Sequence, residues 1–241
     1  MRKAATFFLL IILAMFLSQC KKTSKTQVFY VNYRFIGIRE GSTVKFYETS
    51  NQKTWAYSPG KDFTGPGSFD DVFHFVGPYI GVRNGRTIKF YETNKQGGWY
   101  YSAGKDFTSP DDVDGVFYFF GNSIGVRSGR TIRFYDTHKD GTWTRSTTKD
   151  FVSRGDIGGA FSPIVNYIGI RDGKTVKFYS LNGLGTWIYV AGRNFVSPGG
   201  VDDLLFLNNG VIGVLKDRTI KFYEVDKEGV WTYRAGTDFS F

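Results

Sequence analysis

The chain has 241 residues, a formal net charge of +9 and a single cysteine, Cys20. One cysteine excludes a disulfide within the chain, so the fold depends on its apolar core, for which the 41% of hydrophobic residues is ample. Five of the basic residues lie in the first 25 positions. The remainder is therefore only mildly basic, which argues against a nucleic-acid-binding protein.

The N-terminus has the features of an export signal. A basic start is followed by an apolar stretch from Ala4 to Leu17, which suits a signal-peptide core and is short for a membrane span. The next residues, Leu17-Ser18-Gln19-Cys20, resemble the lipobox of bacterial lipoproteins, although a small residue is usual in place of Gln19. We expect residues 1–19 to be a lipoprotein-type signal peptide, Cys20 to carry the lipid, and residues 20–27 to form a polar tether. The alternative is an ordinary secretory signal with an incidental cysteine.

Residues 28–241 consist of five copies of one unit. All the tryptophans of the chain recur at a step of 44 residues: Trp55, Trp99, Trp143, Trp187 and Trp231. An Ile-Gly pair, a Thr, a Phe-Tyr pair and a closing Phe keep the same step, with no insertion between them. Repeats of this length are typical of solenoids, propellers and arrays.

The second unit shows the expected elements in chain order. A β-branched and aromatic segment around Val72-Phe73 predicts a buried strand, and Gly77-Pro78 predicts a turn after it. Apolar residues then alternate with others from Ile80 to Arg83, which predicts a second strand. Asn84-Gly85 follows, and this pair favours a type I′ hairpin in which both residues have positive φ.

The second half of the unit predicts two more strands. Thr87–Tyr91 alternates again, and Trp99 opens the fourth strand. The Pro-, Asp- and Gly-rich stretch from Ser109 to Gly115 is expected to be a loop. Four short antiparallel strands in about 40–45 residues match a propeller blade.

We therefore predict an all-β fold, a five-bladed β-propeller built of five 44-residue repeats of four antiparallel strands, spanning residues 28–241. If the first strand of each unit is innermost, no blade is shared between the two ends of the domain. Closure of the ring then rests on packing of blade five against blade one.

Two polar series are candidates for ligand binding. The first ends the second strand of four units, Leu215 taking its place in the fifth: Arg39, Arg83, Arg127 and Arg171. Around a propeller axis these side chains would form a positive band for anions or acidic sugars, although packing between blades is the favoured alternative. The second precedes the closing Phe of each unit: Asp62, Asp106, Asp150, Asn194 and Asp238. These side chains either accept hydroxyl groups of a ligand or, as we favour, form Asx-type turns.

Other residues give little support for chemistry. The two histidines, His74 and His138, occupy non-equivalent positions, so neither a histidine metal site nor a catalytic histidine is expected. Acidic pairs such as Asp70-Asp71 and Asp202-Asp203 are expected to be solvated loop residues, with a Ca²⁺ site as the alternative. No cofactor, metal or nucleic acid is expected, and the five tryptophans are expected to pack between blades.

The repeated pattern IGVRNGRTIKFY, GGWYYSAGKDF and DGVFYFFGNS resembles the repeats of the tachylectin-2 family of lectins. That resemblance covers residues 28–241 in organisation and implies a five-bladed propeller that binds N-acetylated sugars at one site per repeat. The Gly-Gly-Trp loop of that family is absent, because Gly-Lys-Asp-Phe and an Asp-rich loop occupy its place. The resemblance therefore implies the fold and the class of ligand, and no individual sugar contact.

Two functions are consistent with the sequence. The first is a multivalent carbohydrate-binding module, anchored by lipid to the periplasmic or surface face of a bacterial membrane. The second is a structural or protein-binding propeller of the cell envelope, with contacts through variable loops such as Gly65-Pro66-Gly67 and Ser162-Pro163. Catalysis is not expected, because an asymmetric active site needs insertions that these repeats lack.

Overall fold

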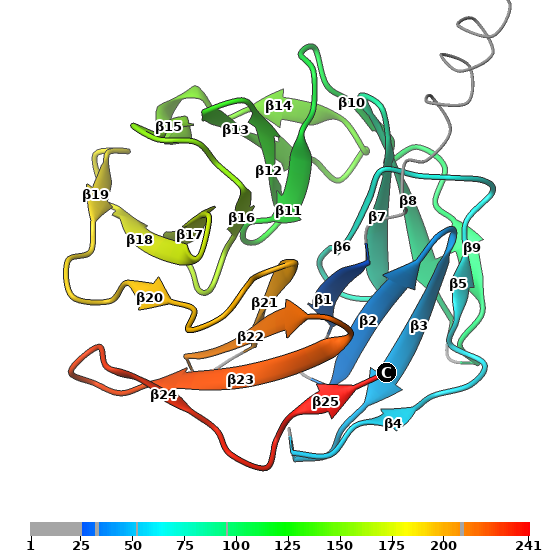
Figure 1. The fold of residues 1–241 in the computed structure, drawn as a ribbon. Helices are drawn as coiled ribbons and strands as arrows, with labels where there is room; N and C mark the ends of the chain where they lie inside the picture. Colours follow the sequence, from blue (N-terminus) through cyan, green and yellow to red (C-terminus); the bar gives the residue numbers. More distant parts are fainter. Residues whose placement is uncertain (1–25, 32–33, 52, 95, 208–209) are drawn as a thin grey trace, which may run out of the picture.

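The computed structural model describes residues 26–31, 34–51, 53–94, 96–207 and 210–241. In these ranges the chain forms 25 strands and a single 3₁₀ turn, η1 (Thr147–Lys149). The strands fall into five separate antiparallel sheets, which lie around a common centre (Figure 1). The fold is therefore the predicted five-bladed β-propeller. The predicted signal peptide and Cys20 lie outside the described residues.

Each blade takes its strands from one repeat. Blade 1 contains β1 (Gln27–Val31), β2 (Phe35–Glu40), β3 (Thr43–Glu48), β4 (Ala56–Tyr57) and β5 (Phe63–Thr64). Blade 2 contains β6 (Asp71–His74), β7 (Tyr79–Asn84), β8 (Thr87–Thr93), β9 (Trp99–Tyr101) and β10 (Phe107–Thr108). Blade 3 contains β11 (Gly115–Tyr118), β12 (Ser123–Ser128), β13 (Thr131–Thr137), β14 (Trp143–Arg145) and β15 (Phe151–Val152). Blade 4 contains β16 (Gly159–Phe161), β17 (Tyr167–Asp172), β18 (Thr175–Leu181), β19 (Trp187–Tyr189) and β20 (Phe195–Val196). Blade 5 contains β21 (Asp203–Leu207), β22 (Val211–Lys216), β23 (Thr219–Val225), β24 (Trp231–Tyr233) and β25 (Phe239–Ser240).

The first strand of every blade is innermost. Strands β1, β6, β11, β16 and β21 contact one another around the centre of Figure 1, and β4, β9, β14, β19 and β24 lie at the periphery. Strand order within a blade follows the chain from the centre outward. No sheet mixes the two ends of the described chain, as the phase of the repeat predicts.

The fourth strand is split into two segments. In blade 2, β9 pairs with one half of β8 and β10 pairs with the other half, so the Trp and the closing Phe begin the two segments. Gly104, with a φ of 91°, lies between them and turns the chain. Blade 3 has Thr148 at the equivalent place, and there the chain forms η1 instead.

The hairpin between the second and third strands differs from the expected geometry in four blades. Asn84 is paired with Thr87 at the end of the hairpin, so the two turn residues are Gly85 and Arg86, not Asn84 and Gly85. Only Gly85 has a positive φ, of 59°, as in a type II′ turn. The predicted type I′ turn is therefore wrong in this blade. Blade 5 alone has two consecutive residues with positive φ, Asp217 and Arg218.

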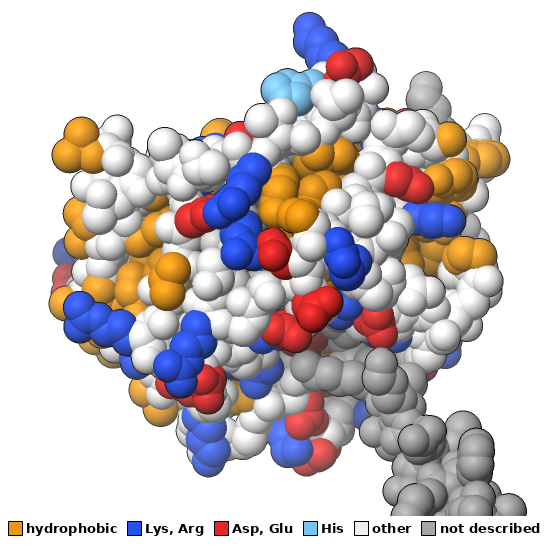
Figure 2. Space-filling model, turned by 90° about the horizontal axis from the view of Figure 1, so that it is seen from above, with side chains coloured by type: hydrophobic (Ala, Val, Ile, Leu, Met, Phe, Trp, Pro, Cys, Tyr) orange, Lys and Arg blue, Asp and Glu red, His pale blue; other side chains and the backbone are white. Residues whose placement is uncertain are grey.

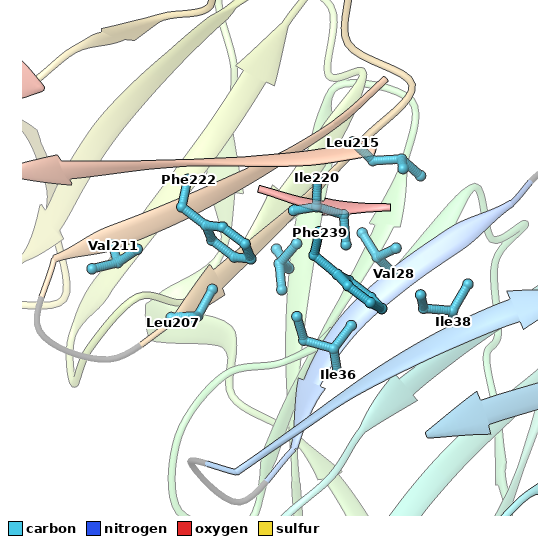
Figure 3. Packing of buried hydrophobic residues seen from close by; sticks show 10 residues of the cluster. Val28, Ile36, Ile38, Leu207, Val211, Leu215, Ile220, Phe222 and Phe239 are labelled. Atoms are coloured by element: carbon cyan, nitrogen blue, oxygen red, sulfur yellow. The ribbon is translucent and has the colours of Figure 1, made fainter. Parts of the chain in front are cut away.

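The hydrophobic core lies between blades. Each indole stacks on the third-strand phenylalanine of the preceding blade, for example Trp99 on Phe46, with ring centroids 5.5 Å apart. The gap between blades 5 and 1 is filled in the same way, by a cluster that joins Val28, Ile36 and Ile38 to residues of β21, β22, β23 and β25 (Figure 3). Leu215, 1% exposed, belongs to this cluster. Packing of blade 5 against blade 1 thus closes the ring, as predicted.

No helix in the described ranges is long and apolar enough to cross a membrane.

Candidate ligand-binding surfaces

The four arginines of the first series lie at one end of the central channel. They line a cavity of about 190 Å³, together with the first residues of the inner strands and Asp70, Asp114 and Asp203. Arg39 and Arg83 are 6% and 7% exposed, so their guanidinium groups lie inside the protein. Burial lowers the pKa of Arg39 and of Arg127, against the opposing effect of nearby aspartates.

Three of these arginines connect neighbouring blades. Arg39 donates to the carbonyl oxygens of Phe69 and Asp70, Arg83 to that of Val113 at 3.1 Å, and Arg127 to that of Ile157 at 2.6 Å. Each acceptor lies just before the inner strand of the following blade. Arg83 also lies 3.7 Å from Asp71. These three arginines thus stabilise the junctions between blades 1 and 2, 2 and 3, and 3 and 4, and Leu215 supplies apolar packing at the junction between blades 5 and 1.

The acidic series lies elsewhere, on the outer strands. Asp62 Oδ2 accepts the hydroxyl of Tyr57 at 2.5 Å, and Asp106 Oδ2 accepts that of Tyr101 at 2.5 Å. Asn194 pairs with Tyr189 in blade 4, and Asp238 with Tyr233 in blade 5. No member of this series bonds its own backbone in the described residues, so the favoured Asx-type turn is wrong. The partner is a side chain five residues earlier.

Blade 3 departs from this arrangement. Arg145 replaces the tyrosine there and forms an ion pair with Asp150. The hydrogen bond that Arg145 donates to Asp150 raises the pKa of Arg145. Blade 3 therefore presents an ion pair where the other four blades present an aromatic ring.

The tyrosine rings are exposed and held in place. Tyr57, Tyr101, Tyr189 and Tyr233 are 46%, 48%, 44% and 42% exposed. Each ring packs against the third-strand tyrosine of its own blade, with centroids 5.6 to 5.7 Å apart. The hydrogen bond to Asp106 is the main cause of a raised pKa at Tyr101, and the same cause acts at Tyr57 and Tyr233.

Lysines of the third strand lie beside two of these rings. Lys89 Nζ is 5.4 Å from the ring centroid of Tyr101, and Lys221 Nζ is 5.9 Å from that of Tyr233. In blades 2 and 5, a ring and a carboxylate of the split outer strand thus lie together with an ammonium group of the third strand. The sequence analysis did not link these tyrosines to the acidic series. The available signal is a hydrogen-bonding residue five positions after each tyrosine.

The two predicted series are not brought together. No hydrogen bond or ion pair joins a channel arginine to the outer-strand acidic series within the described ranges. Figure 2 shows one side of the molecule, where basic and acidic side chains are interspersed rather than gathered in a single-sign patch.

The aspartates before the inner strands have structural partners. Asp70 Oδ2 accepts the amide of Gly85 at 2.8 Å, and Asp114 Oδ2 accepts that of Gly129 at 2.7 Å, so each fixes the hairpin of its own blade. Asp71 is only 7% exposed, and the expectation of a solvated loop residue is wrong for it. Within the described part of the chain, no three His, Cys, Asp or Glu residues are grouped so as to hold a metal ion.

Comparison with known proteins assigns this chain to no family. No protein family and no curated protein matches the sequence. Among solved structures, a protein of unknown function from Desulfotomaculum acetoxidans is 12% identical, with a TM-score of 0.48 over 86% of this chain and 67% of that one. Hsv2p of Kluyveromyces lactis is 15% identical, with a TM-score of 0.42 over 88% of this chain and 72% of that one.

Proposed function

We propose that this protein is a non-catalytic, multivalent carbohydrate-binding propeller held at a membrane surface by a lipid on Cys20. The observation that carries the proposal is the exposed outer-strand tyrosine, paired with an acidic or amide side chain, in four of the five blades. Blade 3, with Arg145, lacks the ring. The number of equivalent sites is therefore four.

One such site has the groups that a sugar requires. The ring of Tyr101 offers an apolar face against which the C–H face of a pyranose can stack. Asp106 Oδ2 keeps acceptor capacity beyond its bond to the tyrosine, and Lys89 supplies donors for further hydroxyl groups. The packing of Tyr101 on Tyr91 fixes the ring before binding, which reduces the ordering cost.

Each ring is nearly half exposed, so we expect a single site to bind weakly. Four sites on one rigid domain convert later contacts with a polymeric glycan into intramolecular events, which raises the overall affinity by about 10²–10⁴. A short tether to a membrane would present several propellers to the same polymer and extend this effect.

A glycan array followed by titration with the full chain tests the proposal. We expect polymeric glycans to bind and the matching monosaccharide to bind only weakly. Tyr101→Ala lowers the avidity, and Tyr57→Ala, Tyr189→Ala and Tyr233→Ala lower it further as they are combined. Arg145→Ala is the matched control, because it changes the equivalent position in the blade without a ring. Absence of glycan binding at millimolar concentration would sink the proposal.

The membrane anchor has its own test, since Cys20 lies outside the described residues. Metabolic labelling with a fatty-acid analogue should mark the wild-type chain and not Cys20→Ala. The variant should leave the membrane fraction. An unlabelled wild-type chain that is nevertheless exported would support the ordinary secretory signal.

A protein-binding propeller is the second candidate. An apolar pocket of about 140 Å³ lies between blades 4 and 5, lined by Ile164, Tyr167, Phe206 and Trp231 among others. Ile164 and Val165 beside it are 55% and 47% exposed. If a co-purifying partner is lost in Ile164→Asp and is insensitive to added glycan, this second function is favoured.

A further inference from the structure

The first residues of the five inner strands form a ring at the arginine end of the channel. Three of them accept the backbone amide of the next blade. Asp203 Oδ2 accepts Val28 N at 2.9 Å, Gln27 Oε1 accepts Val72 N at 3.1 Å, and Asp71 Oδ2 accepts Val116 N at 3.1 Å. In these three places a side chain closes the gap between neighbouring inner strands.

Glycine interrupts the ring at the other two places, Gly115 and Gly159. By the equivalence of the repeats, the amides of Ala160 and Leu204 hold the positions of the three capped valine amides and face the channel. Within the described part of the chain, no side chain accepts a hydrogen bond from either of them. The ring is therefore open on the side of blades 3 to 5, and two strand amides point into the opening.

Arg127 and Arg171 lie over these glycines. A Cβ at Gly115 would be 3.4 Å from Arg127 Nε, and one at Gly159 would be 3.2 Å from Arg171 Nε. A guanidinium group carries five N–H donors. Arg127 uses donors on the carbonyls of Ile157 and Asp114, whereas Arg171 donates only to Gly158 O, at 2.7 Å, among the described residues. Both arginines therefore have further N–H groups that can donate to a ligand.

The cavity at this opening has room for a small molecule. Its volume of about 190 Å³ exceeds by roughly tenfold the space that one water needs. The lining contains as many aspartates as arginines, so the cavity has no large net charge. Two of the aspartates, Asp71 and Asp203, each use an oxygen on a strand amide.

We propose that this opening binds a small oxyanion, a carboxylate or a phosphate group, through the guanidinium groups of Arg127 and Arg171 and the amides of Ala160 and Leu204. Two guanidinium groups and two amides supply donors alone, and charge-assisted hydrogen bonds from such donors are the strong ones. The site goes beyond the carbohydrate-binding proposal, because it involves none of the outer-strand tyrosines and stands if those bind no glycan.

The test follows thermal unfolding of the full chain with increasing sodium phosphate, acetate or galacturonate, at an ionic strength held constant with chloride. We expect Tm to rise with at least one oxyanion as mass action requires, and chloride to have no such effect. If Tm rises with galacturonate but not with phosphate or acetate, the bound carboxylate belongs to an acidic sugar. A wild-type chain that responds to none of the three would overturn the proposal.

Two variants locate the site. Gly115→Asp gives the Ala160 amide the acceptor that Asp71 gives Val116, and its Cβ meets Arg127 only in ordinary contact, so the opening is filled and the response is lost. Arg171→Gln should weaken oxyanion binding about tenfold or more. Arg154→Gln removes the same charge at an exposed position outside the cavity and serves as the control. Near-ultraviolet circular dichroism checks that each variant is folded. Equal responses in Gly115→Asp, Arg171→Gln and the wild type would place the anion elsewhere and refute the assignment.

Discussion

The indole nitrogen of Trp99 donates a hydrogen bond of 2.8 Å to the carbonyl oxygen of Lys61 in the preceding blade. The same bond joins each later tryptophan to the residue 38 positions before it: Trp143 to Lys105, Trp187 to Lys149 and Trp231 to Arg193. At the closing junction, however, Trp55 Nε1 is buried with no hydrogen-bond partner in the described residues. The junction between blades 5 and 1 therefore lacks a bond that the other four share.

Replacing Trp by Phe should reveal this difference. Both Trp99→Phe and Trp55→Phe lose ring area, but only Trp99→Phe also loses a hydrogen bond. We expect the free energy of unfolding to fall by about 0.5–1.5 kcal/mol more for Trp99→Phe, the net value of one such bond. Urea unfolding measures both, and Trp143→Phe should match Trp99→Phe. Equal losses in Trp55→Phe and Trp99→Phe would contradict the assigned role of the indole bond.

The closing junction also depends on the replacement of arginine by Leu215. That side chain is 1% exposed and packs with Val28, Ile38 and Phe239 (Figure 3). Restoring the arginine of the repeat, in Leu215→Arg, would bury a charge in this apolar cluster. We expect a loss of about 3 kcal/mol or more, measured by denaturant unfolding.

Leu215→Met is the matched control, because it keeps the volume and the apolar character and should cost less than about 1.5 kcal/mol. If Leu215→Arg were as stable as Leu215→Met, the guanidinium group would have to find carbonyl partners at this junction, as Arg39 does in blade 1. The closing junction would then resemble those that follow blades 1, 2 and 3.

The number of blades and the identity of the strands could be predicted from the sequence because a repeat records both directly. Four of the five tryptophans and every closing Phe begin a segment of an outer strand, Trp55 directly precedes β4, and the first strand of each unit is innermost. The strand order and the mode of closure follow from the phase of the repeat. The hairpin type was not predictable from Asn84-Gly85 alone, since a shift of one residue in strand pairing changes which two residues form the turn.

The roles of the polar residues were harder to predict, because their partners belong to other units or depend on side-chain direction. Arg83 bonds the carbonyl of Val113, 30 residues later and in the next blade. Asp106 bonds a tyrosine of its own split strand, a pairing that becomes visible only when the outer strand is known to turn at Gly104. The opening at Gly115 depends on which side chains cap amides around the channel, and a spacing of 44 residues does not show that.

The glycine of the repeated Ile-Gly pair has a packing role. A Cβ on Gly81 would lie closer than 3.0 Å to the ring of Phe73 on the neighbouring inner strand, and Gly37, Gly125 and Gly169 meet the equivalent rings in the same way. Gly81→Ala should therefore lower the free energy of unfolding by about 1–3 kcal/mol, as overpacking does. Phe73→Leu combined with Gly81→Ala should lose less than the sum of the two single changes. Additive losses would show that the glycine is needed for another reason.

His74 should make stability depend on pH. Its ring is half-buried on β6, lies near Tyr118 of blade 3 and contacts the Gly77 carbonyl at 3.0 Å. Burial lowers the pKa of His74, and the bond to Gly77 opposes this only in part. The unfolded chain therefore takes up a proton at a higher pH than the folded one. Stability should be complete above about pH 6.5 and should fall as the pH decreases from there toward the lowered pKa of the folded state.

Denaturant unfolding between pH 5 and pH 7.5 measures this loss. His74→Tyr introduces the residue that Tyr30 and Tyr118 supply at the same place in blades 1 and 3, so it should fold and lose less stability across this range. His138→Gln changes the other histidine, which is exposed near the β13–β14 turn, and should keep the wild-type dependence. Parallel curves for the wild type and His74→Tyr would contradict this prediction, because they would mean that His74 binds protons equally in the folded and unfolded states and that other groups cause the dependence.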